Sequence, residues 1–291
     1  QAVYADDLLS KDLNWGIIGV SMRSDTARKQ LAPQDYLYTV STKSSGEMRS
    51  RVIGSILDVL ILSEDRDDII RLGASESISC VTLTVTENGY CHTGAGGIDW
   101  QHPDIAHDTV HPEMARSAPG LLLAILEARM ASKAGPLNII SCDNLSNNGR
   151  ILQTVVLALA EYRDDRLFEW IKQNAAFPNT MVDRIVPSAT LSDIGAFAQT
   201  HFKDNAVITT ENFSQWVMED CLIGNRPPWS AVGVQLTNNV KAFETMKLRF
   251  LNATHSALSY AGLLCGFKFI HETLNDPALE RFATELMAKE A

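Results

Sequence analysis

The chain has 291 residues, 45% of them hydrophobic, so it can form one large domain or two ordinary ones around a sizeable core. Its formal net charge of −10 disfavours nucleic acid and anionic membranes as main partners, because the summed negative field repels phosphate groups. No apolar run reaches the roughly 18 residues that span a bilayer, and no charged-then-apolar leader opens the chain. We therefore expect a cytoplasmic protein.

Short apolar runs rich in β-branched residues alternate with helical patterns through most of the chain. A helical opening comes first, and a helix that ends at Gly73 follows the second strand candidate. The expected strands are residues 14–20, 51–56, 78–86 and 137–144, and later helical patterns cover about 120–133 and 150–174. Strands that alternate with helices predict an α/β fold with a doubly wound sheet, whose ligand crevice lies at the carboxyl ends of the strands.

The pattern changes after residue 188. Residues 189–202 indicate a helix and residues 206–210 a strand, and Pro227-Pro228 then breaks the chain before a long helical run. This predicts an α/β part over 1–238 and the start of an all-helical part over 239–291. Both ends of the chain interrupt helical patterns, so we expect an internal piece of a longer protein.

Polar residues close two of the predicted strands. Thr86-Glu87-Asn88 follows the third strand, and the segment from Ser141 to Asn144 closes the fourth. In a nucleotide-binding sheet such positions face the cofactor or the substrate. Capping is the alternative for the second group, because Asp143 or Asn144 could simply start the following helix.

Several other motifs argue against particular chemistries. His92, His102, His107 and His111 cluster in a segment rich in Pro and Asp, which indicates a surface loop more than a metal site. The five cysteines are odd in number and widely spaced, so we expect reduced thiols. There is no Gly-x-Ser-x-Gly elbow for a serine hydrolase, and the glycines at 94, 96 and 97 match a phosphate loop only weakly.

The helical stretch 240–260 carries three polar residues, Lys247, Asn252 and His255. On an α-helix, Lys247 and His255 lie about 80° apart and Asn252 precedes His255 by three residues, so one pocket edge can hold all three. An apolar set should bury the other flank and leave Lys247 at the edge of the core: Phe243, Met246, Phe250, Leu251, Ala257 and Leu258. Desolvation there would lower the pKa of the lysine, which makes it a candidate general base. The alternative is a solvated face with an edge histidine.

Five segments together resemble a known family, in the same order along the chain: TLTVTENGY, SCDNLSNNG, FPNTMVDRIVP, QWVMED and MKLRFLNATHSALSYAGLLCG. They are similar to the polyol-specific long-chain dehydrogenases, the group of mannitol 2-dehydrogenase and the fructuronate (mannonate) and tagaturonate reductases. The resemblance implies an NAD-dependent, metal-independent oxidoreductase. It also implies a Rossmann-like amino-terminal domain, a helical carboxyl-terminal domain and an active site in the cleft between them.

The same resemblance implies roles for individual residues. The catalytic lysine of the family matches Lys247, and its accompanying residues match Asn252 and His255. Its second active-site asparagine matches Asn144. Asp183 matches a residue that lines the nicotinamide and substrate region, and Glu87 matches one near the cofactor.

Cofactor choice depends on the residues after the first expected strand. Arg23, Ser24 and Asp25 stand where the adenosine ribose would be read. Asp25 favours NAD, because its carboxylate can accept from the ribose hydroxyls, while Arg23 leaves NADP open. The glycine-rich loop of the family, with the strand before it, should precede Gln1, so the chain by itself is expected to bind NAD poorly.

The implied reaction fits the residues. Oxidation of a secondary alcohol needs a base for the hydroxyl proton, which Lys247 can supply, and fixed donors for the developing alkoxide, which Asn144 and Asn252 can supply. His255 would orient the substrate, and Glu244 is either a proton relay or an ion-pair partner. The expected substrates are a polyol or a sugar acid and the corresponding ketose. The alternative is a non-catalytic sugar-binding or regulatory relative that does not bind the cofactor.

Overall fold

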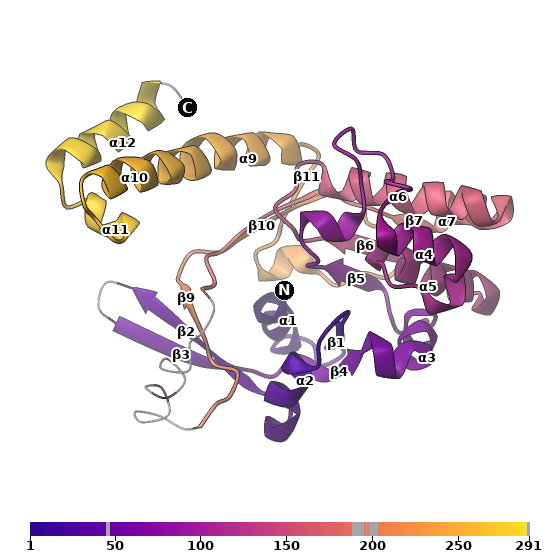
Figure 1. Ribbon diagram of the computed structural model, residues 1–291. Coiled ribbons are helices and arrows are strands. Elements are labelled where there is room, and N and C mark those ends of the chain that lie inside the picture. The colour runs from indigo at the N-terminus through magenta and orange to yellow at the C-terminus, as the bar shows by residue number, and fades with distance from the viewer. Residues whose placement is uncertain (45–46, 188–194, 196, 198–202, 290–291) are drawn as a thin grey trace. The chain divides into compact units, whose positions relative to one another are not determined.

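The computed structural model describes residues 1–44, 47–187, 195, 197 and 203–289 (Figure 1). The chain forms two compact units, unit 1 from Gln1 to Asn238 and unit 2 from Asn239 to Ala291. Unit 1 alternates strands with helices, and the described elements of unit 2 are all helical. The predicted fold class, α/β followed by a helical part, is confirmed.

Two parallel sheets in unit 1 contain the strands expected from the apolar runs. The first pairs β1 (Ile17–Ser21) with β4 (Ile56–Ile61), and the second has the order β5 (Cys80–Leu83), β6 (Leu137–Ser141), β7 (Ala175–Ala176). All five residues of β6 are buried, as expected for a central parallel strand. The carboxyl ends of β5 and β6 lie side by side, because Leu83 pairs with Ser141.

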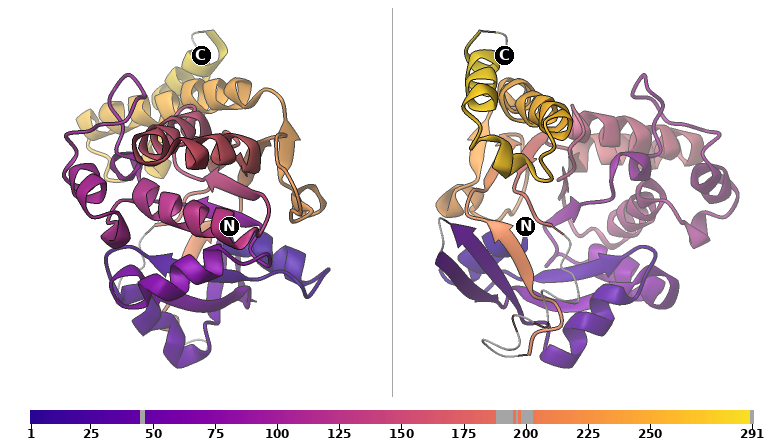
Figure 2. Two further views of the ribbon diagram at one scale, coloured as in Figure 1. Left: turned by 90° about the vertical axis from the view of Figure 1, so that its right-hand side faces the viewer. Right: turned by 60° about the vertical axis from the view of Figure 1, so that its left-hand side comes forward.

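The helices of unit 1 pack around these sheets (Figures 1 and 2). They are α1 (Ala2–Leu9), α2 (Thr26–Leu31), α3 (Leu62–Gly73), α4 (Pro103–Val110), α5 (Ala118–Ser132), α6 (Asn148–Arg163) and α7 (Asp165–Asn174). Helix α5 contacts both α3 and α6, and Leu122 and Leu126 are buried in its core cluster. Helix α3 ends at Gly73 as predicted.

A buried arginine joins the ends of two helices. Arg129 is 2% exposed, and its guanidinium donates to the carbonyl oxygens of Gly73 and Gly135, each at 2.8 Å, and to three other carbonyls nearby. Burial lowers the pKa of Arg129 from its ordinary value. The last carbonyl of α3 and the carbonyls of the loop after α5 thereby gain hydrogen-bond donors.

The expected strand over 51–56 is two strands instead. β3 (Glu47–Ile53) ends before Gly54, and pairs with β2 (Tyr38–Ser44) in an antiparallel hairpin that the sequence did not indicate, while β4 begins at Ile56 (Figure 2). The break has a hydrogen-bonding cause. The Gly54 amide donates to the Asp6 carboxylate at 2.8 Å, and the buried Ser55 hydroxyl donates to the Ala2 carbonyl at 2.8 Å.

The remaining strands belong to two further sheets. β9 (Ile208–Glu211) pairs in parallel with β2, which confirms the strand expected near 206–210. β10 (Gln215–Glu219) lies between β8 (Thr180–Asp183) and β11 (Gln235–Thr237). The helix expected over 189–202 lies outside the described residues.

Unit 2 is helical. α9 (Val240–Met246), a π-helix (Lys247–Asn252) and α10 (Ala253–Leu264) follow one another without a break, and α11 (Ile270–Thr273) and α12 (Pro277–Lys289) complete the unit. Asn239 starts the first helix, because its side-chain oxygen accepts from the Ala242 amide at 3.2 Å. Leu258, Leu279 and Ala283 form the core of the unit.

Candidate functional site

The candidate residues of unit 1 lie at or just beyond the ends of four strands. Arg23 and Asp25 follow β1, Glu87 follows β5, and Asn144 follows β6, while Asp183 is the last residue of β8. Arg23, Glu87 and Asn144 are exposed, and Asp25 and Asp183 are half-buried. Strand ends of this kind place polar groups where a ligand can reach them.

Asp143 fixes the loop that carries Glu87. Its carboxylate accepts hydrogen bonds from the Val85 amide at 2.9 Å, the Thr86 amide at 3.1 Å and the Tyr90 hydroxyl at 2.8 Å. Helix α6 begins later, at Asn148, so Asp143 does not start it. Asp143 therefore holds the segment after β5 against the segment after β6.

Thr86 has a strained backbone within that loop, with φ 64° and ψ 166°. A β-branched residue rarely adopts this region, and such strain persists only where the surroundings enforce it. The bond from the Thr86 amide to Asp143 is part of that enforcement. The strain lies directly before Glu87, and strained residues often accompany binding sites.

Tyr90 also holds the segment after β5 against the end of β6. It is fully buried, and its hydroxyl contacts Ser141 Oγ as well as the Asp143 carboxylate. Burial raises the pKa of Tyr90, and the nearby Asp143 charge raises it further. The phenol thus stays neutral and remains a hydrogen-bond donor to Asp143.

Asn148 joins the segment after β6 to the start of β8. Its side-chain amide donates to the carbonyls of Asp143 at 3.1 Å and Thr180 at 3.0 Å, and its oxygen accepts from the Thr180 amide at 2.9 Å. Asn148 is fully buried. It therefore sets the relative positions of the two chain segments that carry Asn144 and Asp183. Sequence reasoning did not single out Asn148, although the run of polar residues after β6 includes it.

Two ion pairs occupy the residues after β1. Arg23 pairs with Asp104 at 3.3 Å, and Asp25 pairs with Lys29 at 2.8 Å across one turn of α2. The Arg23 side chain is 83% exposed, so the first pair adds little to stability. Both side chains can therefore exchange these partners for a ligand at small cost.

A cavity of about 980 Å³ lies between the edges of β1 and β5. Its walls include Ile18 and Val20 from one strand and Val81 and Leu83 from the other. Of the residues predicted for the site, Arg23 lines the cavity, whereas Asp25, Glu87, Asn144 and Asp183 do not. The cavity is therefore lined by apolar side chains of both strands and by polar residues that include Arg23, Asn88 and His102.

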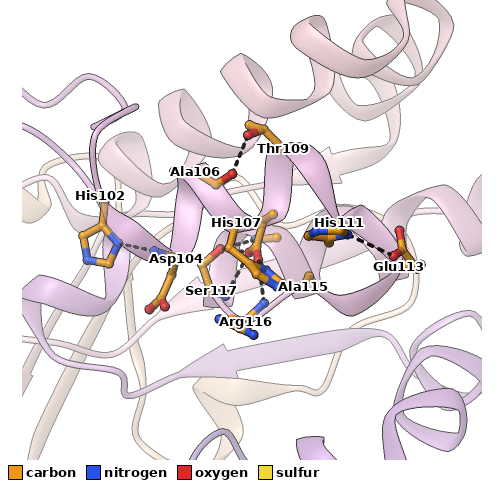
Figure 3. A network of polar contacts seen from close by, with 12 residues as sticks. His102, Asp104, Ala106, His107, Thr109, His111, Glu113, Ala115, Arg116 and Ser117 are labelled. Carbon is orange, nitrogen blue, oxygen red and sulfur yellow. Dashed lines mark hydrogen bonds and ion pairs between the residues drawn. The ribbon is translucent and has the colours of Figure 1, made fainter.

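The histidine segment is a helix and not the expected loop. Pro103 occupies the first turn of α4, and His102 caps it by accepting from the Asp104 amide at 3.2 Å (Figure 3). The loop prediction overlooked that His107 and His111 lie four residues apart, and their rings are 5.2 Å apart. Within the described part of the chain, no group of three His, Cys, Asp or Glu side chains could hold a metal ion.

The polar contacts of this segment connect α4 to the residues directly before α5 (Figure 3). The buried Asp108 carboxylate accepts from the amides of Arg116 and Ser117, at 2.7 and 2.9 Å, and from the Ser117 hydroxyl at 2.6 Å. His107 contacts the same carboxylate at 3.0 Å. A carboxylate at a helix amino terminus is favourable, so Asp108 anchors α4 to α5.

In unit 2, Lys247, Asn252 and His255 lie on one continuous helical stretch. Lys247 is half-buried, and Asn252 and His255 are exposed. The expectation for the apolar flank is correct for Leu258, which is 4% exposed. It is wrong for Met246, Phe250 and Leu251, which are exposed, because the core of the unit forms on the Leu258 side against α12. Across the described helices of both units, none is long and apolar enough to cross a membrane.

Two family models match the chain. The mannitol dehydrogenase Rossmann domain covers residues 2–231, and the mannitol dehydrogenase C-terminal domain covers residues 239–291. The D-mannonate oxidoreductase of Escherichia coli is 39% identical over 297 residues, which span 100% of this chain and 61% of that protein. The mannitol 2-dehydrogenase of Aspergillus clavatus is 38% identical over 300 residues, covering 99% of this chain and 60% of the relative.

Solved structures agree with the sequence relatives. The mannitol 2-dehydrogenase of Pseudomonas fluorescens, in a ternary complex with NAD and D-mannitol, matches with a TM-score of 0.91 and 39% identity, over 100% of this chain and 60% of that one. A substrate-free D-sorbitol dehydrogenase matches with a TM-score of 0.92 and 31% identity, over 98% of this chain and 60% of that one. The chain thus spans about three fifths of the length of these relatives. On the matches to both family models, the chain belongs to the mannitol dehydrogenase family.

Proposed function

We propose that the full-length protein is an NAD-dependent oxidoreductase that interconverts a secondary alcohol of a polyol or sugar acid and the corresponding ketose. The observation that carries the proposal is the set of Lys247, Asn252 and His255 on one helical stretch of a chain that belongs to the mannitol dehydrogenase family. A similar structure of that family contains NAD and D-mannitol. The proposed reaction needs no metal ligands from this chain.

Lys247 is the proposed general base. It is half-buried at the start of the π-helix. In alcohol oxidation the amine accepts the hydroxyl proton, and in ketone reduction the ammonium returns it. Asn252 and, from unit 1, Asn144 are the proposed amide donors to the developing alkoxide. His255 is proposed to orient the substrate by hydrogen bonding.

Unit 1 offers residues that fit a dinucleotide. The cavity rim at Arg23 and the acidic side chain of Asp25 follow β1, where such a sheet reads the ribose hydroxyls. Glu87 and Asp183 are proposed to lie near the nicotinamide end, on segments fixed by Asp143 and Asn148. When bound, the nicotinamide accepts or supplies the hydride.

The cavity between β1 and β5 supports a place for one more strand. A dinucleotide-binding sheet of order 3-2-1-4-5-6 has its first strand at the centre, between the second and the fourth. The observed orders β4-β1 and β5-β6-β7 supply the third, second, fourth, fifth and sixth strands, and the cavity lies between the second and the fourth. We propose that the first strand and the glycine-rich loop after it occupy this space in the full-length protein.

The test is NADH oxidation by the full-length protein with fructose, fructuronate and tagaturonate. Lys247→Ala is expected to lower turnover on the preferred substrate by about 10² to 10⁴, because the reaction loses its general base. Lys241→Ala is the matched control, since Lys241 is an exposed lysine on the same helix, and it should keep near-normal turnover. Unchanged turnover in Lys247→Ala would refute the assigned base.

Calorimetry distinguishes the enzyme from the sugar-binding alternative. The full-length protein should bind NAD in the absence of sugar and the sugar in the presence of NAD. Sugar binding without NAD binding would instead favour a non-catalytic relative. Comparing NAD with NADP in the same experiment tests Asp25, because Asp25→Ala should weaken preference for NAD.

A further inference from the structure

The helix of unit 2 changes from α to π geometry at Lys247. The π-helix covers Lys247–Asn252, and at its end the Ala253 amide donates to the Leu248 carbonyl, five residues earlier. Regular α-helix precedes it in α9 and follows it in α10. A single π turn in an otherwise regular helix corresponds to one residue more than an α turn contains, and such turns are frequent at functional sites.

The extra residue changes which side chains share a face. On an uninterrupted α-helix, Lys247 and Asn252 would lie about 140° apart, on nearly opposite faces, with His255 between them. A π turn brings residues five apart one above the other, as an α turn does for residues four apart. Lys247, Asn252 and His255 then fall within roughly 60° of arc.

We propose that the π turn is a positioning device that places the lysine, the asparagine and the histidine in one row. The four residues between Lys247 and Asn252 act as a spacer whose length matters more than its side chains. Leu248, Phe250 and Leu251 are 49%, 44% and 44% exposed, so packing within this chain does not require them at these positions. The inference rests on the function proposed above, because the row has a use only if these three residues act together.

Deletion of Leu248 in the full-length protein is the first test. Removing one residue converts the π turn into an α turn, which leaves the asparagine four residues and the histidine seven residues after the lysine. That spacing keeps the row on a regular helix. We expect turnover within about tenfold of the parent protein, since residual shifts of the lysine are small. Deletion of Ser256, an exposed residue in regular helix before the buried Leu258, is the matched control and should lower the unfolding midpoint.

An exchange at constant length is the second test, which remains informative if the deletion variant does not fold. In the double variant Lys247→Leu/Leu248→Lys, the amine moves one residue along. With a π turn, the moved amine no longer lies in the row with Asn252 and His255. Turnover should then fall on the order of 10², towards the level of Lys247→Ala. On an uninterrupted α-helix, by contrast, residues four apart share a face. The moved lysine would then lie on the face of Asn252, and the variant would retain activity.

The outcomes separate the two proposals. If Lys247→Ala loses activity, but a folded deletion variant loses it equally or the exchanged variant keeps it, the π turn does not position the row. If Lys247→Ala keeps full turnover, the proposed function itself fails. Helix content by circular dichroism and the unfolding midpoint show in each case whether the variant is folded.

Discussion

The two units of the chain bury their apolar side chains to very different extents. In unit 1, a continuous cluster joins β5, β6, α5 and α6, and Leu126, Ile139 and Val156 within it have no exposed surface. In unit 2, the core consists of Leu258, Leu279 and Ala283, while Leu264 is 89% exposed. Within this chain, unit 1 thus carries its own packing energy, whereas the helix with the proposed base gains little from burial. Substitutions in unit 1 should act on stability, and those along the proposed row in unit 2 on turnover.

The largest expected effect on stability comes from the core of unit 1. Leu126→Ala should lower the free energy of unfolding by about 2–5 kcal/mol, because it leaves a cavity beneath a fully buried helix. Leu264→Ala, at an exposed position of unit 2, should change it by less than about 0.5 kcal/mol. Urea unfolding of the 291-residue chain measures both. Equal losses for the two leucines would show that the contrast in packing does not hold.

Removal of Asp143 should follow in size. Asp143→Ala leaves the amides of Val85 and Thr86 and the hydroxyl of Tyr90 without their acceptor, which should cost roughly 2–4 kcal/mol. Asp143→Asn keeps one acceptor oxygen and should cost less. The exposed Asp67 provides the control Asp67→Ala, with little expected change in chemical denaturation. A neutral Asp143→Ala variant would contradict the role of this carboxylate in unit 1.

The stability of unit 1 at alkaline pH gives a smaller expected effect, through the buried thiol of Cys91. Burial, and after it the charge of Asp104, raises the pKa of Cys91 from 9.0 to about 12. The folded protein therefore keeps the thiol proton after the unfolded chain has lost it. This contribution is complete below pH 9 and declines as the pH rises towards 12, by at most about 1.4 kcal/mol per pH unit.

The Cys91 contribution can be isolated by substitution. Cys91→Ala should flatten the decline of the unfolding midpoint between pH 9 and 10.5, while the exposed Cys265 in unit 2 provides the control Cys265→Ala. Parallel pH profiles for the parent and Cys91→Ala would mean that this thiol is not protected by the fold.

Patterns with a direct physical meaning were predictable from the sequence. Buried apolar runs gave the strands at 17–21, 80–83 and 137–141, and Gly73 marked the end of α3. The hairpin β2–β3 was missed, because its strands are largely polar and show little alternation. The histidine helix was missed because Pro and Asp were taken for loop residues, although both suit a first helical turn.

Candidate site residues could be proposed from the sequence, but their geometry could not. Lys247 and Asn144 were proposed from the family resemblance, whereas Asp143 and Asn148 act through contacts between segments distant in sequence, which no local pattern contains. The π turn was also beyond prediction, because every angular argument assumed the α-helical rotation per residue. The exposure of Phe250 and Leu251 depends on which side of the helix packs against α12, which periodicity alone does not determine.

The positive φ of Thr86 also bears on attempts to make this protein more heat-tolerant. Glycine adopts that backbone region without steric penalty, so Thr86→Gly would relieve strain on the order of 1–3 kcal/mol, against roughly 1 kcal/mol for the greater freedom of glycine in the unfolded chain. The peptide before Glu87 would then lose its single enforced orientation. A search for thermostable variants would therefore select at position 86 a change that loosens the loop carrying Glu87, the proposed cofactor residue, so thermal stability and NAD affinity would have to be measured together.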